Sequence, residues 1–501
     1  MSRNIEESWW RGDEMSRGLR RSKLTLFDVT NLVVGGAIGA DIYIAGAFGA
    51  QFLGPFSLLV WVLGGVMAIT IALAFAHCAA LTREAGGPYA YAKEAWGPFA
   101  GFTVGWSLWL AEWVSLAVFP VAFVQYLMFF VPSLDAVLQL VVKILFVTFL
   151  AVTNIVGVRA AGKTNDLLTL VKLGPLVLFI GFGLFYMFIH PALTISNFLP
   201  FFPSGFSGFG ATLVLVFWAY AGFELSTIPA NEIKDPERTI PRAMVLGMSI
   251  VTIFYLLTNL VLFGLVSTAK LAVDTAPLAS AATVAFGLNA TLALIGGVIL
   301  GVGVLVCVSG SDETGMIGTA SLGYALATEG LFPKSFSKTH KRFKTPYVAI
   351  LVQSVTTLVA SIFGSLGLLV ATSVFLLAIP YFATSLSVIY LRKKNLKRGH
   401  RMMGGRAVPI LGAIFSIFLV TQCAVPQIML GIVLIVMGIP IYARYAPKKE
   451  LVELKSELFS RRSILEKVER DEQKFLAHLL GHIKGLYRRG AHKRGAPNDQ
   501  R

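Results

Sequence analysis

The sequence predicts an all-α integral membrane protein with about twelve transmembrane helices. Three observations indicate this fold class. Of the 501 residues, 55% are hydrophobic and only 14% are charged, and the mean hydropathy of +0.72 is too high for a soluble globular chain of this length. Apolar runs of about 20 residues, the length that a helix needs to cross a bilayer, recur along the chain. Lys and Arg residues collect in alternate connections between these runs.

The predicted helices follow a polar amino-terminal segment, residues 1–24, which lacks the apolar core and cleavage site of a signal peptide. The apolar runs place the helices at approximately 26–50, 55–81, 98–130, 135–157, 166–190, 208–229, 243–268, 288–327, 346–363, 366–391, 407–424 and 426–445. A polar tail, residues 446–501, carries apolar residues at three- and four-residue intervals. This tail is expected to be a cytoplasmic helix, either solvated or lying on anionic lipid.

Basic residues predict the orientation of these helices. They occupy the connections after the second, fourth, sixth, eighth and tenth helices, whereas the other connections are almost free of them, with Lys270 as the main exception. The net charge of +16 therefore reflects membrane topology and indicates no nucleic-acid partner. We expect a multi-pass protein of the cell membrane, surrounded by the lipid bilayer, with both termini in the cytoplasm.

Two of the predicted helices contain residues that interrupt a helix. The first includes Gly35, Gly36 and Gly39, and the sixth reads FWAYAGFELSTIPANE (217–232), in which Gly222 stands beside Glu224. Glycine costs about 1 kcal/mol in a helix interior, and unpaired backbone groups in lipid cost more, so a break is tolerated where it lines a cavity. The alternative is that these glycines only allow neighbouring helices to pack closely.

The positions of the two breaks favour a binding site over close packing. They fall in the first and sixth helices, which are corresponding members of two five-helix halves at about 25–190 and 208–391, followed by two extra helices at 407–445. Equivalent breaks in two halves are typical of transporters built from inverted repeats. The amide end of a half-helix attracts a carboxylate and the carbonyl end attracts a cation, and an amino acid zwitterion carries both groups.

Four segments, taken in order, resemble the amino acid–polyamine–organocation (APC) superfamily of transporters. They read VGGAIGADIY (34–43), REAGGPYAYAKEAWGPFAGFTVGW (83–106), FWAYAGFELSTIPANEIKDPERTIPRA (217–243) and GYALATEGLFPKSFSKTHKRFKTP (323–346). The likeness extends over residues 25–445. It implies a LeuT-type fold, in which two inverted five-helix repeats give alternating access to a site near the middle of the membrane.

The resemblance also implies the residues of the site. Amides near Gly36, Ala37, Ile38 and Gly39 would bind a substrate carboxylate. Its ammonium would bind carbonyls near Val34 and Gly35 and near Phe217, Trp218, Ala219, Tyr220 and Ala221. Trp218 matches an aromatic residue that closes over bound substrate, and Glu224 matches an acidic residue implicated in coupling.

A lysine near the start of the fifth helix is a candidate for coupling. Lys172, in TLVKLGPLVLF, matches a lysine whose ammonium takes the place of a sodium ion in sodium-independent relatives. An ammonium buried between helices binds backbone carbonyls when charged and releases them when neutral, which makes Lys172 a candidate proton carrier. Its alternative role is that of a lysine whose head group reaches the cytoplasmic interface.

Acidic residues inside the apolar runs are candidates for substrate selectivity, because an intramembrane carboxylate is rare and usually functional. Glu112, near the middle of the third helix, would receive a basic substrate side chain, take up a proton, or stay neutral and hydrogen-bonded. Asp41 and Asp312 lie in the first and eighth helices. Together with Glu224 these residues form an acidic set that would favour a cationic substrate.

The sequence also excludes several classes of function. GVRAAGKT (157–164) fits the phosphate-loop pattern, but its flanks are membrane spans rather than a strand and a helix of a soluble domain, so we expect no nucleotide. Neither a metal-ligand spacing nor a catalytic motif stands out, so we expect no metal site, no cofactor and no enzymatic activity.

These observations predict an amino acid transporter or exchanger that is proton-coupled, sodium-independent and works by alternating access. Its partners would be a proton and a small-molecule substrate. The substrate would be an amino acid, either neutral or cationic. One alternative is a carrier of polyamines or other organic cations, because of the acidic set. Another alternative is a sensor of the same fold that binds substrate without transporting it.

Overall fold

The computed structural model describes residues 25–39, 41–82, 87–157, 162–203, 205–224, 233–287, 289–394 and 403–447, and for 162–172 and 236 it describes the backbone alone. The predicted amino-terminal segment and all but the first two residues of the predicted tail lie outside these ranges. The chain divides into two compact units, Met1–Tyr442 and Ala443–Arg501. The contacts described below lie within the first unit.

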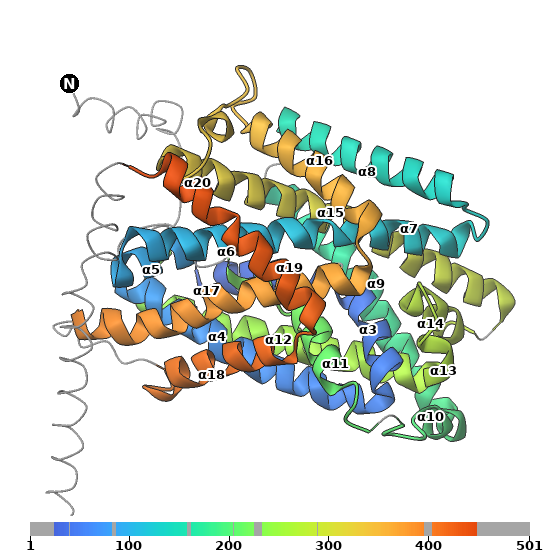
Figure 1. The fold of residues 1–501 in the computed structure, drawn as a ribbon. Coiled ribbons are helices and arrows are strands. Elements are labelled where there is room, and N and C mark those ends of the chain that lie inside the picture. The colour runs from blue at the N-terminus through green and yellow to red at the C-terminus, as the bar shows by residue number, and fades with distance from the viewer. Residues whose placement is uncertain are drawn as a thin grey trace, which may run out of the picture. The chain divides into compact units, whose positions relative to one another are not determined.

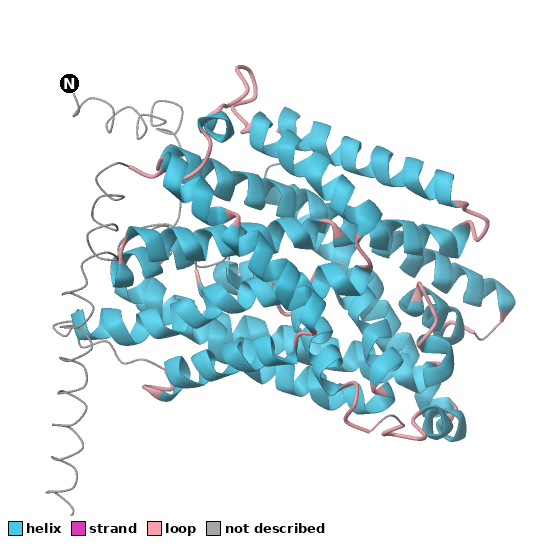
Figure 2. Ribbon diagram, in the orientation of Figure 1, coloured by secondary structure: helices cyan, strands magenta, loops and turns pink. Residues whose placement is uncertain are grey.

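The described part of the chain consists of helices joined by turns (Figures 1 and 2), as the sequence predicts. The helices of the amino-terminal half are α2 (Leu26–Ala37), α3 (Asp41–Phe52), η2 (Gly54–Phe56), α4 (Ser57–Leu81), α5 (Pro88–Trp96), α6 (Pro98–Leu116), α7 (Val118–Phe130), α8 (Ala136–Val156), α9 (Gly162–Ile189) and α10 (Pro191–Asn197). They are followed by α11 (Phe209–Trp218), α12 (Pro236–Leu265), α13 (Thr268–Leu271), α14 (Pro277–Ala285), α15 (Ala290–Thr328), η5 (Lys334–Ser337), α16 (Tyr347–Phe363), α17 (Leu366–Lys394), α18 (Ala407–Gln422), α19 (Val425–Val436) and α20 (Gly438–Tyr445).

Within the described residues, seven helical segments are long and apolar enough to cross a membrane, or nine if each of two bent helix pairs is one span. The bent pairs are α2 with α3, at 50°, and the carboxyl-terminal part of α9 with α10, at 108°. Three shorter apolar helices, α11, α16 and α18, lie where further spans are predicted. The chain is therefore a multi-pass membrane protein, while the count of about twelve and the inverted repeat stay predictions.

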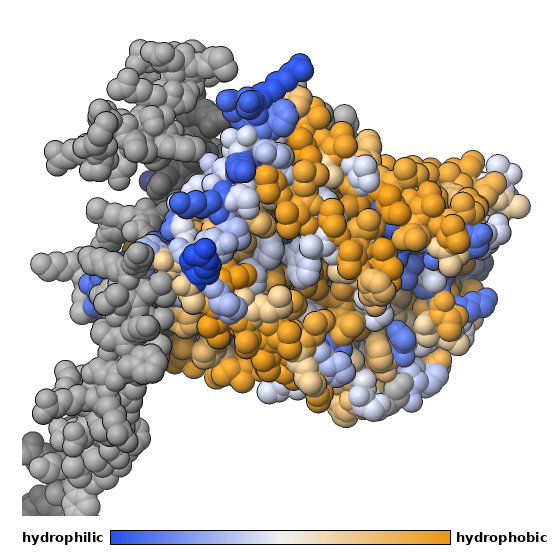
Figure 3. Space-filling model, turned by 45° about the horizontal axis from the view of Figure 1, so that its top comes forward, coloured by the Kyte–Doolittle hydropathy of each residue, from blue (hydrophilic) through white to orange (hydrophobic). Residues whose placement is uncertain are grey.

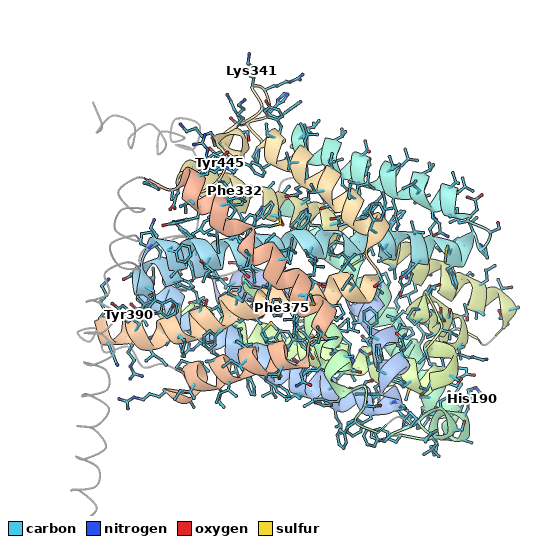
Figure 4. All side chains as sticks on the ribbon, viewed as in Figure 1. His190, Phe332, Lys341, Phe375, Tyr390 and Tyr445 are labelled. Carbon is cyan, nitrogen blue, oxygen red and sulfur yellow. The ribbon has the colours of Figure 1, made fainter. Side chains whose placement is uncertain are left out.

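Large apolar side chains are exposed along the outer helices, as a lipid environment requires. On α8, for example, Val137, Leu145 and Phe149 are all more than 60% exposed. Figure 3 shows a broad apolar surface, with hydrophilic residues gathered at one end of the visible face. Figure 4 shows Lys341 at the tip of the connection between η5 and α16, and His190, where α9 meets α10, on the opposite side.

Local sequence signals explain where several helices begin and end. Asp135 caps α8 by accepting a hydrogen bond from the amide of Leu138 at 2.8 Å. The same helix ends at Gly157, which adopts a left-handed conformation with φ of 69°. Asn289 caps α15 in the same way as Asp135 caps α8, through the amide of Leu292.

Two predicted elements differ from the observed ones. The predicted helix 98–130 is divided into α6 and α7 at Ala117, close to Pro120, which has no amide hydrogen to donate. The predicted helix 243–268 begins earlier, at Pro236, because proline is well suited to the first turn of a helix. The last residues of the phosphate-loop pattern, from Gly162 onward, belong to α9.

Candidate functional site

The first predicted break separates α2 from α3. Gly35 and Gly36 lie in the last turn of α2, which ends at Ala37, and the amide of Ile38 closes that turn by donating to the carbonyl of Val34 at 2.7 Å. The next helix begins at Asp41. The carboxyl end of α2, which exposes carbonyl groups and carries a partial negative charge, therefore lies close to the amino end of α3. That end exposes amide groups and carries a partial positive charge.

The second break follows α11. After Trp218 the chain continues in tight turns, in which the amides of Ala219, Tyr220 and Ala221 donate to the carbonyls of the residues three positions earlier. Gly222 then adopts a φ of +107°, a conformation that residues with a side chain rarely adopt. Helical geometry therefore ends where the sequence places FWAYAG.

The two breaks touch each other. A Cβ atom added to Gly36 would lie 3.1 Å from the carbonyl oxygen of Gly222, and one added to Gly222 would lie 2.4 Å from the carbonyl oxygen of Gly36. A side chain at Gly222 would clash with this backbone, and one at Gly36 would require it to shift by a few tenths of an ångström. Gly36 and Gly222, which predict the two breaks, are thus also the residues through which the breaks contact each other.

A tyrosine of α12 connects the same two breaks. The hydroxyl of Tyr255 lies 2.6 Å from the carbonyl oxygen of Ala37 and 2.8 Å from that of Ala219. Its single proton can be donated to one of these carbonyls at a time. Since Tyr255 is fully buried, its hydroxyl stabilises both helix ends in their present positions.

Glu224 links the second break to α17. Its carboxyl group is fully buried and accepts hydrogen bonds from the amide of Gly222, at 2.6 Å, and from the hydroxyl of Tyr381. Buried carboxylates require such partners, because an unpaired charge in an apolar interior is very costly. A change in the charge of Glu224 would therefore change the strength of its hydrogen bond to the amide of Gly222.

Trp218 lies at the end of α11 and faces the junction of α6 and α7. It is only 2% exposed, and its Nε1 donates to the hydroxyl of Ser115 at 2.9 Å. Its ring centroid is 6.2 Å from that of Phe119. Of the other residues predicted at this break, Phe217, Ala219 and Tyr220 are also buried, and Ala221 is half-buried.

Three of the four predicted acidic residues interact. The carboxyl group of Glu112 on α6 interacts electrostatically with those of Glu224 and Asp41. Asp312, in contrast, is fully buried and interacts electrostatically with none of them. The α15 residue that reaches the first break is its neighbour Ser311, whose hydroxyl would lie 3.0 Å from a Cβ added to Gly39.

The side chain of Lys172 lies outside the part of the chain that the structure describes, although its backbone belongs to α9. Three residues further on, the ring of Pro175 would lie 2.7 Å from a Cβ added to Gly303 of α15. The helix that carries Lys172 therefore packs against α15.

Sequence reasoning did not find Tyr255, Tyr381 or Ser311. The two tyrosines stand in apolar runs, VTIFYLLTNL and LLAIPYFATS, where a polar tip is the only available signal. Nothing in those runs indicates that the hydroxyl groups meet the two breaks.

Comparison with known proteins assigns the family. The sequence model of the family described as amino acid permease matches residues 24–443, and the chain belongs to this family. The serine/threonine exchanger SteT of Bacillus subtilis (strain 168) is 29% identical over 453 residues, which cover 86% of this chain and 98% of SteT. The branched-chain amino acid permease BcaP of the same organism is 26% identical over 453 residues, covering 86% of this chain and 94% of BcaP. A methylthioribose transporter, also from this organism, is 25% identical over 456 residues, covering 87% of this chain and 96% of the relative.

The predicted membership of the APC superfamily is thereby confirmed. The chain is a transporter and not an enzyme, as the sequence predicts.

Proposed function

We propose that the protein carries amino acids across the cell membrane by proton-coupled, sodium-independent secondary transport. The observation that carries this proposal is the contact between Gly36 and Gly222, with the hydroxyl of Tyr255 beside a carbonyl of each break. A rearrangement of one break must therefore alter the other. Two of the relatives are named for amino acids, which supports the substrate class.

The half-helix ends carry the groups that an amino acid zwitterion needs. We assign its ammonium to the carbonyls of Val34 and Gly35 and of the segment 217–221, because helix carboxyl ends attract cations. We assign its carboxylate to the amides of residues 36–39. In the described conformation Ile38 already donates to Val34, so carboxylate binding requires the last turn of α2 to open.

Alternating access would follow from rocking of α2, α3, α4, α11 and α12 against the remaining helices. Trp218 would leave Ser115 and close over the bound substrate, since its hydrogen bond to Ser115 joins α11 to the other group of helices. Glu224 would couple this motion to proton uptake through its hydrogen bonds to Gly222 and Tyr381.

Substitution of Tyr255 by phenylalanine should lower amino acid uptake about fivefold. The change removes one buried hydrogen bond, worth about 1 kcal/mol, and keeps the ring. Uptake into proteoliposomes measures the effect, and Tyr390→Phe, at an exposed position of α17, is the matched control. If Tyr255→Phe transported at the rate of Tyr390→Phe, the hydroxyl would have no role in holding the breaks.

Substitution of Lys172 by alanine should remove the pH dependence of uptake while substrate binding survives, because an amine that releases its proton on burial can carry that proton. Uptake by wild-type and Lys172→Ala proteoliposomes would be measured over a range of pH, together with binding to the purified proteins. Unchanged pH dependence would exclude Lys172 as the proton carrier.

The substrate class is tested by competition binding to purified protein. The panel contains amino acids, their decarboxylated amines and polyamines, each with and without sodium. Binding of amino acids but not of their decarboxylated amines, independent of sodium, would support the proposal. Equal competition by the amines would contradict the proposal, because it would show that the backbone amides of residues 36–39 do not bind a substrate carboxylate.

A carrier of polyamines or other organic cations is the second candidate. Asp41 stands in the first turn of α3, where it offers its own carboxylate to the helix amides, and Glu112 interacts electrostatically with both Asp41 and Glu224. Three carboxyl groups in one region favour a substrate with more than one positive charge. The amine arm of the binding panel tests this alternative directly.

We also propose that both termini are cytoplasmic. The proposal rests on the Lys and Arg residues in alternate connections, such as that between η5 and α16, where Lys341 projects from the helices (Figure 4). Cysteine labelling from either side of the membrane would test it, with a cysteine introduced at Lys341.

A further inference from the structure

A second group of buried polar side chains lies between α8, α15 and α16, three helices that pack on one another (Figure 1). This acceptor cluster consists of Asn154, Asp312, Gln353 and Thr357, each at most 1% exposed. Both carboxyl oxygens of Asp312, Oδ1 of Asn154, Oε1 of Gln353 and Oγ1 of Thr357 have no hydrogen-bond partner among the described residues. Each such buried atom costs about 1–3 kcal/mol, so a group of them indicates a ligand.

Met316 shows that these side chains share one region. Its carbonyl accepts a hydrogen bond from Nε2 of Gln353 at 2.8 Å, and its sulfur lies 3.6 Å from Nδ2 of Asn154. Asp312 precedes Met316 by one turn of α15, and Thr357 follows Gln353 by one turn of α16. Because α15 and α16 run antiparallel, Asp312 and Thr357 lie on the same side of the hydrogen bond between Met316 and Gln353. Each is one helical turn, about 5.4 Å, away from it along its own helix.

The junction of α6 and α7 reaches the same part of α15. A Cβ added to Gly315 would lie 2.9 Å from Cδ2 of Leu116. Pro120 has no amide hydrogen, so the carbonyl of Leu116 cannot receive its usual helical hydrogen bond.

Four of the five unpaired atoms of the cluster are acceptors only, and the fifth, the hydroxyl oxygen of Thr357, can accept or donate. The amide nitrogens of Asn154 and Gln353 already donate, to the carbonyls of Leu150 and Met316. One carboxyl group surrounded by neutral oxygens calls for a single positive charge. We infer that the acceptor cluster binds one small cation, either a proton on Asp312 or a monovalent metal ion held by the surrounding oxygens.

Among the described side chains, other charged groups on the helices packed around Asp312 have partners elsewhere; the side chain of Lys172 on α9, which also packs against α15, lies outside the described part of the chain. Glu112 on α6 interacts with Glu224 and Asp41, and Lys143 on α8 donates to the carbonyl of Ser361 at 2.7 Å. Tyr126 on α7 donates to the carbonyl of Tyr43, the ring of Tyr347 on α16 lies beside His340, and Cys307 on α15 interacts with Tyr43 and Tyr255. Glu313 and Tyr324 are the other titratable residues of α15. Asp312 is therefore the group whose charge the ligand would balance.

The test is the thermal stability of the purified full-length protein without substrate, so its result does not depend on the proposed transport function. One arm adds sodium, lithium or potassium chloride against choline chloride at a fixed alkaline pH. The other arm varies pH in choline chloride alone. The variants are Asp312→Asn and Thr357→Val, and Glu313→Gln is the control that removes the same charge one residue away.

We expect a cation, or acidification, to raise the melting temperature of the wild type and of Glu313→Gln by about 2 °C or more. The shift should be absent in Asp312→Asn and weaker in Thr357→Val, which keeps the side-chain volume. A response in the metal arm identifies a metal ion, and a response in the pH arm alone identifies a proton. Equal responses of the wild type and both cluster variants, or no response in either arm, would overturn the inference.

Discussion

Substitution of Gly222 by alanine should reduce amino acid uptake about tenfold or more. The φ of +107° at Gly222 is strained for any residue with a side chain, at a cost of about 1–3 kcal/mol. The added Cβ would also lie 2.4 Å from the carbonyl oxygen of Gly36, which is backbone and cannot move aside cheaply. Relief of this clash must separate the two breaks and distort the site between them.

The matched control for this substitution is Gly181→Ala on α9. A Cβ at Gly181 meets no atom within 4 Å, and alanine in a helix is more stable than glycine by about 0.5–1 kcal/mol. Uptake and binding would be measured for both variants in proteoliposomes, after their folding is checked by thermal stability. Transport by folded Gly222→Ala at the rate of the control would show that contact between the breaks is dispensable.

Substitution of Glu224 by alanine should also nearly abolish uptake. It leaves the half-buried amide of Gly222 and the buried hydroxyl of Tyr381 without their acceptor, at about 1–3 kcal/mol for the buried group. Glutamine at the same position can still accept from Gly222 and donate to Tyr381, but it carries no charge. Glu224→Gln should therefore keep substrate binding and lose the uptake that a proton gradient drives.

Two further variants complete the comparison. Tyr381→Phe removes one of the two hydrogen bonds and should reduce uptake less than Glu224→Ala does. Glu237→Ala removes an exposed carboxylate in the first turn of α12 and serves as the control. If Glu224→Gln responded to a proton gradient like the wild type, the coupling role of Glu224 would be wrong.

The helices and both breaks could be read from the sequence because each leaves a local signal. A span such as α15 is a long apolar run, and lipid forces such a run to satisfy its own backbone hydrogen bonds as a helix. Gly35, Gly36 and Gly222 mark the places where that helix is weakest. The connections carry the basic residues, which predict orientation without any knowledge of packing.

The contacts among these elements leave no such signal. Ser311 and Asp312 are neighbours in sequence, yet adjacent helical residues point about 100° apart. Ser311 reaches the first break, whereas Asp312 precedes by one turn Met316, whose carbonyl accepts a hydrogen bond from Gln353 of α16. The grouping of Asp312 with Asp41, Glu112 and Glu224 stays a prediction, because the rotation of α15 relative to its neighbours leaves no signal in the sequence. The third predicted span, 98–130, is confirmed as Pro98–Phe130, and only the turn residue Ala117 between α6 and α7 was not predicted.

By itself the sequence determined that this protein is a helical membrane transporter of the amino acid permease family with two interrupted helices. Hydrophobic length and glycine position are local properties, and they are sufficient for those conclusions. Only the tertiary structure decided that Gly36 meets Gly222, that the hydroxyl of Tyr255 lies beside both breaks, and that Tyr381 donates to Glu224. Those pairings depend on how whole helices are rotated and packed, and packing is decided by all the side chains of an interface together.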